Sequence, residues 1–172
     1  MTEKYAFIKV LITVDPPPMR APLISGHDFP VGAMDENSLT VCQKWEGRLR
    51  SLFPNRRYLA LANDINGRRV LASRFLRKIA PPQRVQAQLS HSARSAVLMS
   101  AQLVSSIPFI ADSIVFPGVL DVWTSVDEML KIGYGDEEEH CILLICWLLS
   151  MDIPAVMLLG HALPEGPKAA YG

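Results

Sequence analysis

The residues best suited to chemistry lie between Gly133 and Ser150, in the stretch GYGDEEEHCILLICWLLS. Four acids, Asp136 to Glu139, stand directly before His140 and Cys141. A thiol near the start of a helix is acidified by the helix dipole, and a histidine partner would make it a nucleophile. The spacing therefore raises two interpretations, a reactive thiol or simply the start of a helix.

The acids themselves favour a helix start. Asp136 and Glu139 have the D-x-x-E spacing of a capping box, and carboxylates there complement the helix dipole by roughly 0.3–1 kcal/mol each. Cys141 lies one turn deeper, in the apolar run that ends at Leu149, where burial raises a thiol's pKa and makes it inert. We therefore expect Cys141 to be a core residue.

No metal site is predicted around these residues. Cys141 and Cys146 are five residues apart, which places them on different faces of a helix, and His140 adds too few ligands for zinc. We expect His140 to lie on the helix surface or to be hydrogen-bonded. No cofactor is indicated by any other motif.

Further elements follow from local patterns. Asn66-Gly67 between two apolar runs predicts a hairpin, and Ser125 with Glu128 predicts a second capping box, in a helix that Gly133 ends. The remaining predictions are a strand over Tyr5–Val14, a loop over 19–36, a helix over Ser38–Leu52 capped by Asn37 or Ser38, and a strand over Ile153–Leu159.

The prolines in APPQ, residues 80–83, predict a domain boundary. They divide the chain into a first region, residues 1–80, a linker, 81–96, and a second region, 97–172. Hydrophobic residues make up 49% of the chain and charged residues 20%, so it can bury a core.

The location of the chain is indicated by its cysteines and its apolar segments. Three cysteines are too few and odd in number for a secreted disulfide framework, which favours reduced thiols in the cytoplasm. The apolar segment Cys141–Gly160 is interrupted by Asp152 and Pro154, so a buried helix, a turn and a strand explain it better than a membrane span.

Charge is distributed unevenly along the chain. Lys44 to Arg84 holds eleven Lys and Arg against two acids, whereas the part from Asp112 onward holds ten acids against two lysines. The two parts either attract each other or face separate partners. Four arginines near the hairpin form a candidate patch for anionic lipid or an acidic partner: Arg56, Arg57, Arg68 and Arg69.

Two kinds of ligand are not expected at the hairpin. No aromatic signature of RNA binding accompanies the arginines, so nucleic acid is not an expected partner. Only Asp64 lies in the hairpin loop, whereas calcium binding of the C2 type needs several loop carboxylates.

Several segments together resemble a known family. The stretches GDEEEHCILLICWLLSMDIPAVMLLGHALPEGPKAAY and IPFIADSIVFPGVLDVWTS resemble the transglutaminase-like module of the coiled-coil and C2 domain-containing ciliary proteins. DPPPMRAP, CQKWEGRLRS and RRYLALANDINGRRVLASRFL resemble the region before that module. The resemblance implies an α+β fold, with a β-rich, C2-related first region and an incomplete transglutaminase-like α/β module after it.

The resemblance also implies that the module is inactive. Active relatives carry a pattern similar to Gly-x-Cys before the helix, and here Gly135-Asp136-Glu137 occupies it, which puts Glu137 at the nucleophile position. A carboxylate cannot replace a thiolate in acyl transfer, and the His and Asp partners would come from strands beyond Gly172. The chain is therefore predicted to bind rather than to catalyse.

The implied role is that of a scaffold in cilium assembly, at the transition zone and basal body, with other transition-zone proteins as partners. The candidate binding residues are the acidic run and the PEGP turn: Asp136, Glu137, Glu138, Glu139, Pro164, Glu165, Gly166 and Pro167. Two alternatives remain open, a cysteine-dependent transglutaminase-like peptidase and a C2-type module that binds anionic lipid.

Overall fold

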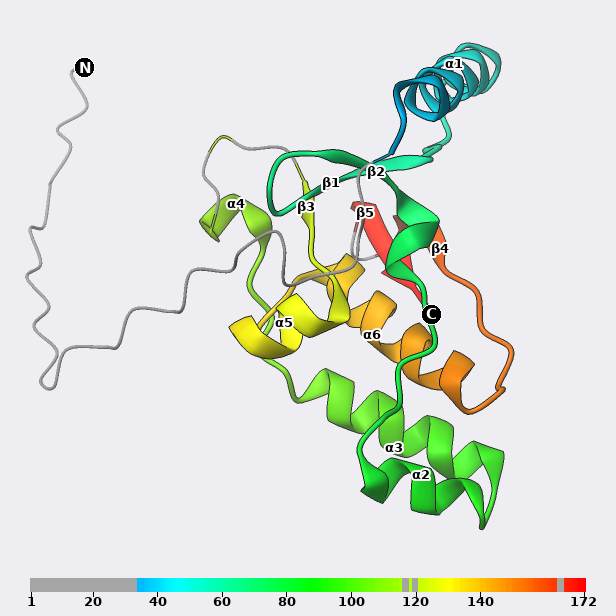
Figure 1. Ribbon diagram of the computed structural model, residues 1–172, viewed down its shortest axis with the longest axis vertical. Coiled ribbons are helices and arrows are strands. Elements are labelled where there is room, and N and C mark those ends of the chain that lie inside the picture. The colour runs from blue at the N-terminus through cyan, green and yellow to red at the C-terminus, as the bar shows by residue number, and fades with distance from the viewer. Residues whose placement is uncertain (1–33, 116–117, 119–120, 164–165) are drawn as a thin grey trace, which may run out of the picture.

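The computed structural model of the chain describes residues 34–115, 118, 121–163 and 166–172, and it has the predicted α+β character. Figure 1 shows its helices and strands. The helices are α1 (Glu36–Leu52), α2 (Gln83–Leu89), α3 (Ala93–Ser105), α4 (Asp112–Val115), α5 (Val126–Ile132) and α6 (Glu137–Ser150), with a 3-10 helix, η1 (Ala72–Phe75). The strands are β1 (Leu61–Asp64), β2 (Arg69–Leu71), β3 (Val122–Trp123), β4 (Leu158–Ala162) and β5 (Gly166–Tyr171). The strand predicted over Tyr5–Val14 lies outside the described residues, as does most of the loop 19–36.

Helix α1 begins earlier than the sequence predicts. Asp35, rather than Asn37 or Ser38, is its N-cap, because the Asp35 carboxylate accepts a hydrogen bond from Ser38 N at 2.9 Å. The helix lies at one end of the molecule (Figure 1) and buries one residue, Glu46. Glu46 Oε1 accepts hydrogen bonds from Ala60 N at 2.6 Å and Leu61 N at 3.0 Å, so a carboxylate connects α1 to the start of β1.

The hairpin predicted at Asn66-Gly67 is confirmed by the antiparallel pairing of β1 with β2. Gly67 has the left-handed φ of 72°, and its N–H donates to Asp64 O at 2.9 Å. The Asp64 carboxylate accepts from Asn66 N and Arg68 N, so it satisfies the backbone donors of the turn.

The sheet and the core both cross the boundary that the prolines predict. The order of the three-stranded sheet is β2-β1-β3, with β3 parallel to β1, so strands from residues 1–80 and 97–172 pair directly. The segment 81–96, expected to be a linker, instead holds α2 and the start of α3. Val85 and Ala96 are fully buried there in one cluster with Leu148, because α2 packs on α3 and α3 packs on α6.

Helix α6 is the centre of the core. It is apolar on nearly all sides, as expected of a helix surrounded by protein, and it contacts α3, α5 and β5. Trp123 of β3 lies in the same core, with its ring 5.6 Å from that of Phe75 and nearly edge-on to it. The start of α6 is therefore held in place from several directions.

The strand after α6 lies further along the chain than predicted. Residues 153–157 are not paired in a sheet, and β4 begins at Leu158 rather than at Ile153. The reason is local, because Ile153 N donates back to Leu148 O at 3.0 Å and Pro154 has no N–H to offer a neighbouring strand. Within the described residues, no helix has the length and apolar character needed to cross a membrane.

Candidate functional site

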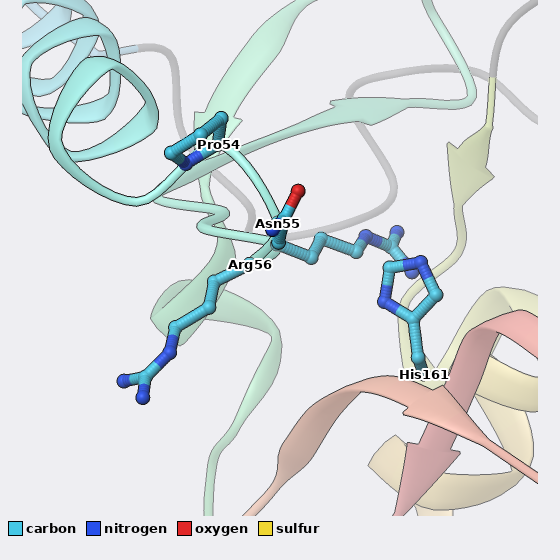
Figure 2. Close-up of a pocket in the computed structure, with 5 residues that line it drawn as sticks. Pro54, Asn55, Arg56 and His161 are labelled. Carbon is cyan, nitrogen blue, oxygen red and sulfur yellow. The ribbon is translucent and has the colours of Figure 1, made fainter.

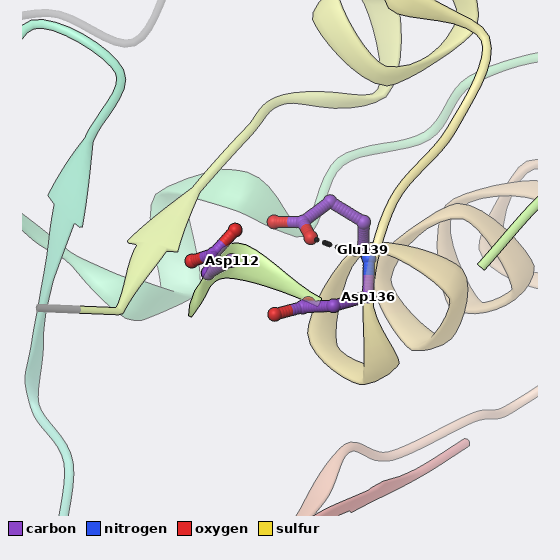
Figure 3. Close-up of side chains that lie close together, drawn as sticks. All are labelled: Asp112, Asp136 and Glu139. Atoms are coloured by element: carbon purple, nitrogen blue, oxygen red, sulfur yellow. Dashed lines mark hydrogen bonds between the residues drawn. The ribbon is translucent and has the colours of Figure 1, made fainter. Parts of the chain in front are cut away.

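The start of α6, where the sequence places its main binding candidates, is built as predicted. Asp136 is the N-cap, and its carboxylate accepts from Glu138 N at 3.1 Å. Glu139 returns its carboxylate to Asp136 N at 3.1 Å, which completes the capping box (Figure 3). The capping box of Ser125 and Glu128 and the Gly133 stop, with φ 86°, are confirmed as well.

Three of the four acids at the start of α6 face the protein interior rather than solvent. Glu138 is fully buried and Asp136 and Glu139 nearly so, whereas Glu137 is half-buried. Glu139 Oε1 accepts from Thr124 N at 2.8 Å, so the same carboxylate that caps α6 also connects it to the end of β3. Three of the four acids predicted to bind a partner are therefore buried in the fold and expose little surface to a partner.

Two groups of three carboxylates meet at Asp136. One contains Asp112 and Glu139, and Figure 3 shows these three carboxylates gathered on one side of the start of α6. The other contains Asp121 and Glu138, and in each group one oxygen from every residue lies within 4.8 Å of the others. Such oxygen donors match the ligand preference of Mg²⁺ and Ca²⁺. The sequence predicts no metal ligands, so this grouping is a feature that only the structure reveals.

The burial of these acids changes their protonation. Desolvation, aided by the neighbouring Glu139, raises the pKa of Asp136 to about 9. Desolvation also raises the pKa of Glu138 to about 8, with Asp121 and Asp136 adding repulsion that Arg57 partly offsets. The pKa of Glu139 is raised too, chiefly by burial. At neutral pH the cluster therefore favours a compensating positive species, whether protons or a cation.

Arg57 contacts this cluster as a cation. Its Nη2 lies 3.0 Å from Asp121 Oδ2 and 3.2 Å from Glu138 Oε1, and its side chain is 18% exposed. Arg57 was predicted to belong to a surface patch, but it points inward because the acids of the second region attract it. These bonds connect Arg57 to two acids that lie 64 and 81 positions further along the sequence.

The other three patch arginines also have partners of their own. Arg68 pairs with Asp64 at 2.7 Å, Arg69 lies 3.9 Å from Glu46, and Arg56 stacks over the Phe53 ring at 5.6 Å. The patch is thus less available to an acidic partner than its sequence suggests. Lipid binding by these residues stays a prediction.

A shallow groove of about 530 Å³ lies beside the patch, lined by Pro54, Asn55, Arg56, Arg57 and His161. In Figure 2 the Arg56 side chain points away from His161, so the two do not converge on a common point.

His140 and Cys141 do not form a catalytic pair. Both ring nitrogens of His140 face backbone carbonyls, Nδ1 at 2.7 Å from Asp136 O and Nε2 at 3.1 Å from Ile107 O. Cys141 is 5% exposed, and burial raises the pKa of its thiol to about 12, with Glu138 adding repulsion. Both residues line a groove of about 410 Å³ with Phe109 and Tyr171, but the thiol there is protonated and the imidazole is engaged elsewhere.

Gly135, which precedes the N-cap of α6, is required for packing. A Cβ at this residue would lie 2.7 Å from Glu139 Cβ and 2.9 Å from Met129 Cε. Gly135 also pairs with Phe109 in an isolated parallel bridge. The backbone at Gly135 therefore lies close against Glu139, in the first turn of α6, with no room for a side chain between them.

Half of the PEGP turn lies outside the described residues, namely Pro164 and Glu165. Gly166 opens β5 with a left-handed φ of 83°, and Pro167 follows in the strand. A binding role for this turn stays a prediction.

The uneven distribution of charge along the sequence was consistent with contacts between the basic and acidic parts, but it did not identify the residues of the carboxylate cluster at Asp136. Among the described residues, four ion pairs join the basic stretch to the acidic part of the chain: Arg57–Asp121, Arg57–Glu138, Arg77–Asp127 and Lys78–Asp152. Attraction between the two parts, one of the two alternatives, is therefore observed. Asp112 and Asp121 could not be singled out, since no local pattern marks them.

Comparison with known proteins supports the resemblance drawn from the sequence. Residues 121–171 match the family model of the CEP76 peptidase-like domain. The chain is 28% identical to the human protein CC2D2B over 127 aligned residues, and this alignment covers 74% of the chain. The chain spans only 9% of the length of that relative. No solved structure matches the chain.

Proposed function

This chain is related to the CC2D2- and CEP76-like family, and from this premise we propose that it is a non-catalytic interaction module acting in cilium assembly. The finer proposal places it at the ciliary transition zone and basal body as a scaffold for other transition-zone proteins. The location follows from the family resemblance, and the non-catalytic role from the chemistry of the site.

The observation that carries the non-catalytic role is the state of the nucleophile position. The family resemblance puts Glu137, the first residue of α6, at this position, and a carboxylate is a poor substitute for a thiolate in acyl transfer from an amide. The nearest thiol, Cys141, is buried with a raised pKa, and His140 directs both ring nitrogens to carbonyl oxygens. A peptidase-like framework with these three features favours binding over turnover.

A surface for a partner is available next to the buried acids. The groove at Cys141 is bordered by Phe109, which is 56% exposed, and by Tyr171, which is 46% exposed. Exposed aromatic side chains bordering a groove are typical of protein interfaces. We propose that a protein partner contacts this aromatic rim rather than the acids Asp136, Glu138 and Glu139.

The proposal is tested by proximity labelling of the tagged chain in ciliated cells. Enrichment at the ciliary base, with transition-zone proteins labelled, is the expected result. Phe109→Asp should reduce the labelling of partners, whereas the matched variant Val156→Asp, at another exposed apolar residue, should not. A uniform cytoplasmic signal with no ciliary enrichment would reject the proposal.

Neither alternative function is favoured by a specific observation. A cysteine peptidase needs a reactive thiol, and the buried Cys141 argues against it. An anionic-lipid site needs available cations, and Arg57, Arg68 and Arg69 are engaged by acids of the chain. If Arg68→Ala with Arg69→Ala abolished salt-sensitive binding to anionic vesicles, the lipid alternative would replace the scaffold proposal.

A further inference from the structure

The acids around Asp136 present a feature that the capping box does not explain. Glu138 contributes nothing to that box through its side chain, yet it is fully buried with its side chain 1% exposed. One of its oxygens, Oε1, faces Arg57 Nη2 at 3.2 Å. The other, Oε2, makes no hydrogen bond to any residue that the structure describes. A buried carboxylate oxygen without a partner is costly and indicates a missing ligand.

A matching donor without an acceptor lies on the same ion pair. Arg57 Nη1 is buried and makes no hydrogen bond within residues 34–115, 118, 121–163 and 166–172. The ion pair of Arg57 and Glu138 thus leaves one acceptor and one donor without hydrogen-bond partners, and a single ligand could satisfy both. A hydrated cation can, because the ion binds the carboxylate oxygen and its water accepts from the guanidinium.

The charge and spacing of the surrounding groups fit the same ligand. Asp121, Asp136 and Glu138 place one carboxylate oxygen each within 4.8 Å of the others, and they come from two separate segments of the chain. With all three ionised and Arg57 bound to two of them, the group carries a net charge of −2. A divalent cation neutralises that charge.

We propose that Asp121, Asp136 and Glu138 form a site for a hydrated divalent cation of the hard class, Mg²⁺ or Ca²⁺. Carboxylate oxygens without sulfur or imidazole ligands select this class over Zn²⁺ or Cu²⁺. The ion connects the start of α6 to the segment before β3, so its role is to fix the geometry of this corner of the fold. The site borders the groove, since Asp136 is one of the residues that line it, but it does not depend on the proposed ciliary role.

The experiment is calorimetric titration of the full 172-residue chain, stripped with EDTA and dialysed, with MgCl₂ and separately with CaCl₂. Binding of one equivalent of either cation is the expected result. Glu138→Gln keeps the size of the side chain and should weaken binding at least about tenfold, since even indirect contacts to a bound metal are worth that much.

The matched control is Glu137→Gln, which removes an adjacent charge from the same helical turn but belongs to neither group of carboxylates. It should bind the cation with unchanged affinity. Asp136→Asn, which keeps an N-cap side chain, is a second variant expected to weaken binding, and far-UV circular dichroism in EDTA establishes that each variant is folded.

Three results would overturn the proposal. They are no binding of either cation at millimolar concentration, equal loss of binding in Glu138→Gln and Glu137→Gln, and full binding in a folded Glu138→Gln variant. In the first case a buried water, or a proton shared among the acids, satisfies Glu138 instead.

Discussion

The thiol of Cys141 should react slowly with iodoacetamide in the native protein. Burial raises its pKa from an ordinary 9.0 to about 12, which lowers the thiolate population about a thousandfold, at tenfold per pH unit. A more basic thiolate is also a better nucleophile, with a slope of about 0.4–0.5, which restores about 16- to 30-fold. The net expectation is alkylation about 30- to 60-fold slower than in the unfolded chain, before steric protection is added.

The assay is a pulse of iodoacetamide at pH 8, quenched and followed by peptide mass spectrometry, in buffer and in denaturing urea. Cys42, which is partly exposed on α1, is the internal control and should be alkylated faster than Cys141 in the native state. A native rate for Cys141 equal to its rate in urea would show that the thiol is neither buried nor suppressed. A native rate above the urea rate would restore the peptidase alternative.

Three further predictions concern stability. Gly135→Ala should cost about 1–3 kcal/mol in urea unfolding, because its Cβ would lie 2.7 Å from that of Glu139; no loss would mean that the backbone yields there. Glu46→Leu should cost about 2–4 kcal/mol, since two amides at the start of β1 lose their shared acceptor, while Glu46→Gln keeps that oxygen and should retain most of the stability. In EDTA the melting temperature should fall from pH 5 to pH 9. The pKa values of Asp136 and Glu138 are raised to about 9 and 8, so the folded state keeps these protons at pH values where the unfolded state, with ordinary carboxyl pKa values, has released them. Each group therefore lowers the free energy of unfolding by up to about 1.4 kcal/mol per pH unit as the pH rises. A melting temperature that rises over this range would show that the acids are ionised in the folded protein.

The sequence by itself determined the features whose partners lie within three or four residues. Both capping boxes pair residues three apart, and Gly133 and Gly67 take the left-handed conformation that glycine allows. Such interactions depend on the backbone of one turn, so a residue pattern is sufficient to identify them. The α+β class and the family resemblance were accessible for a similar reason, since both follow from linear patterns.

Only the tertiary structure decided which way the charged side chains point. Arg57 bonds to acids 64 and 81 residues away, and nothing next to Arg57 in the sequence distinguishes it from Arg56, which stays at the surface. The same holds for the acidic run, where Glu137 is half-buried and Glu138 fully buried although they are neighbours in one helical turn. A helix places successive residues about 100° apart, so the position of β3 and Arg57 around α6, and not the acid itself, determines which carboxylate is buried.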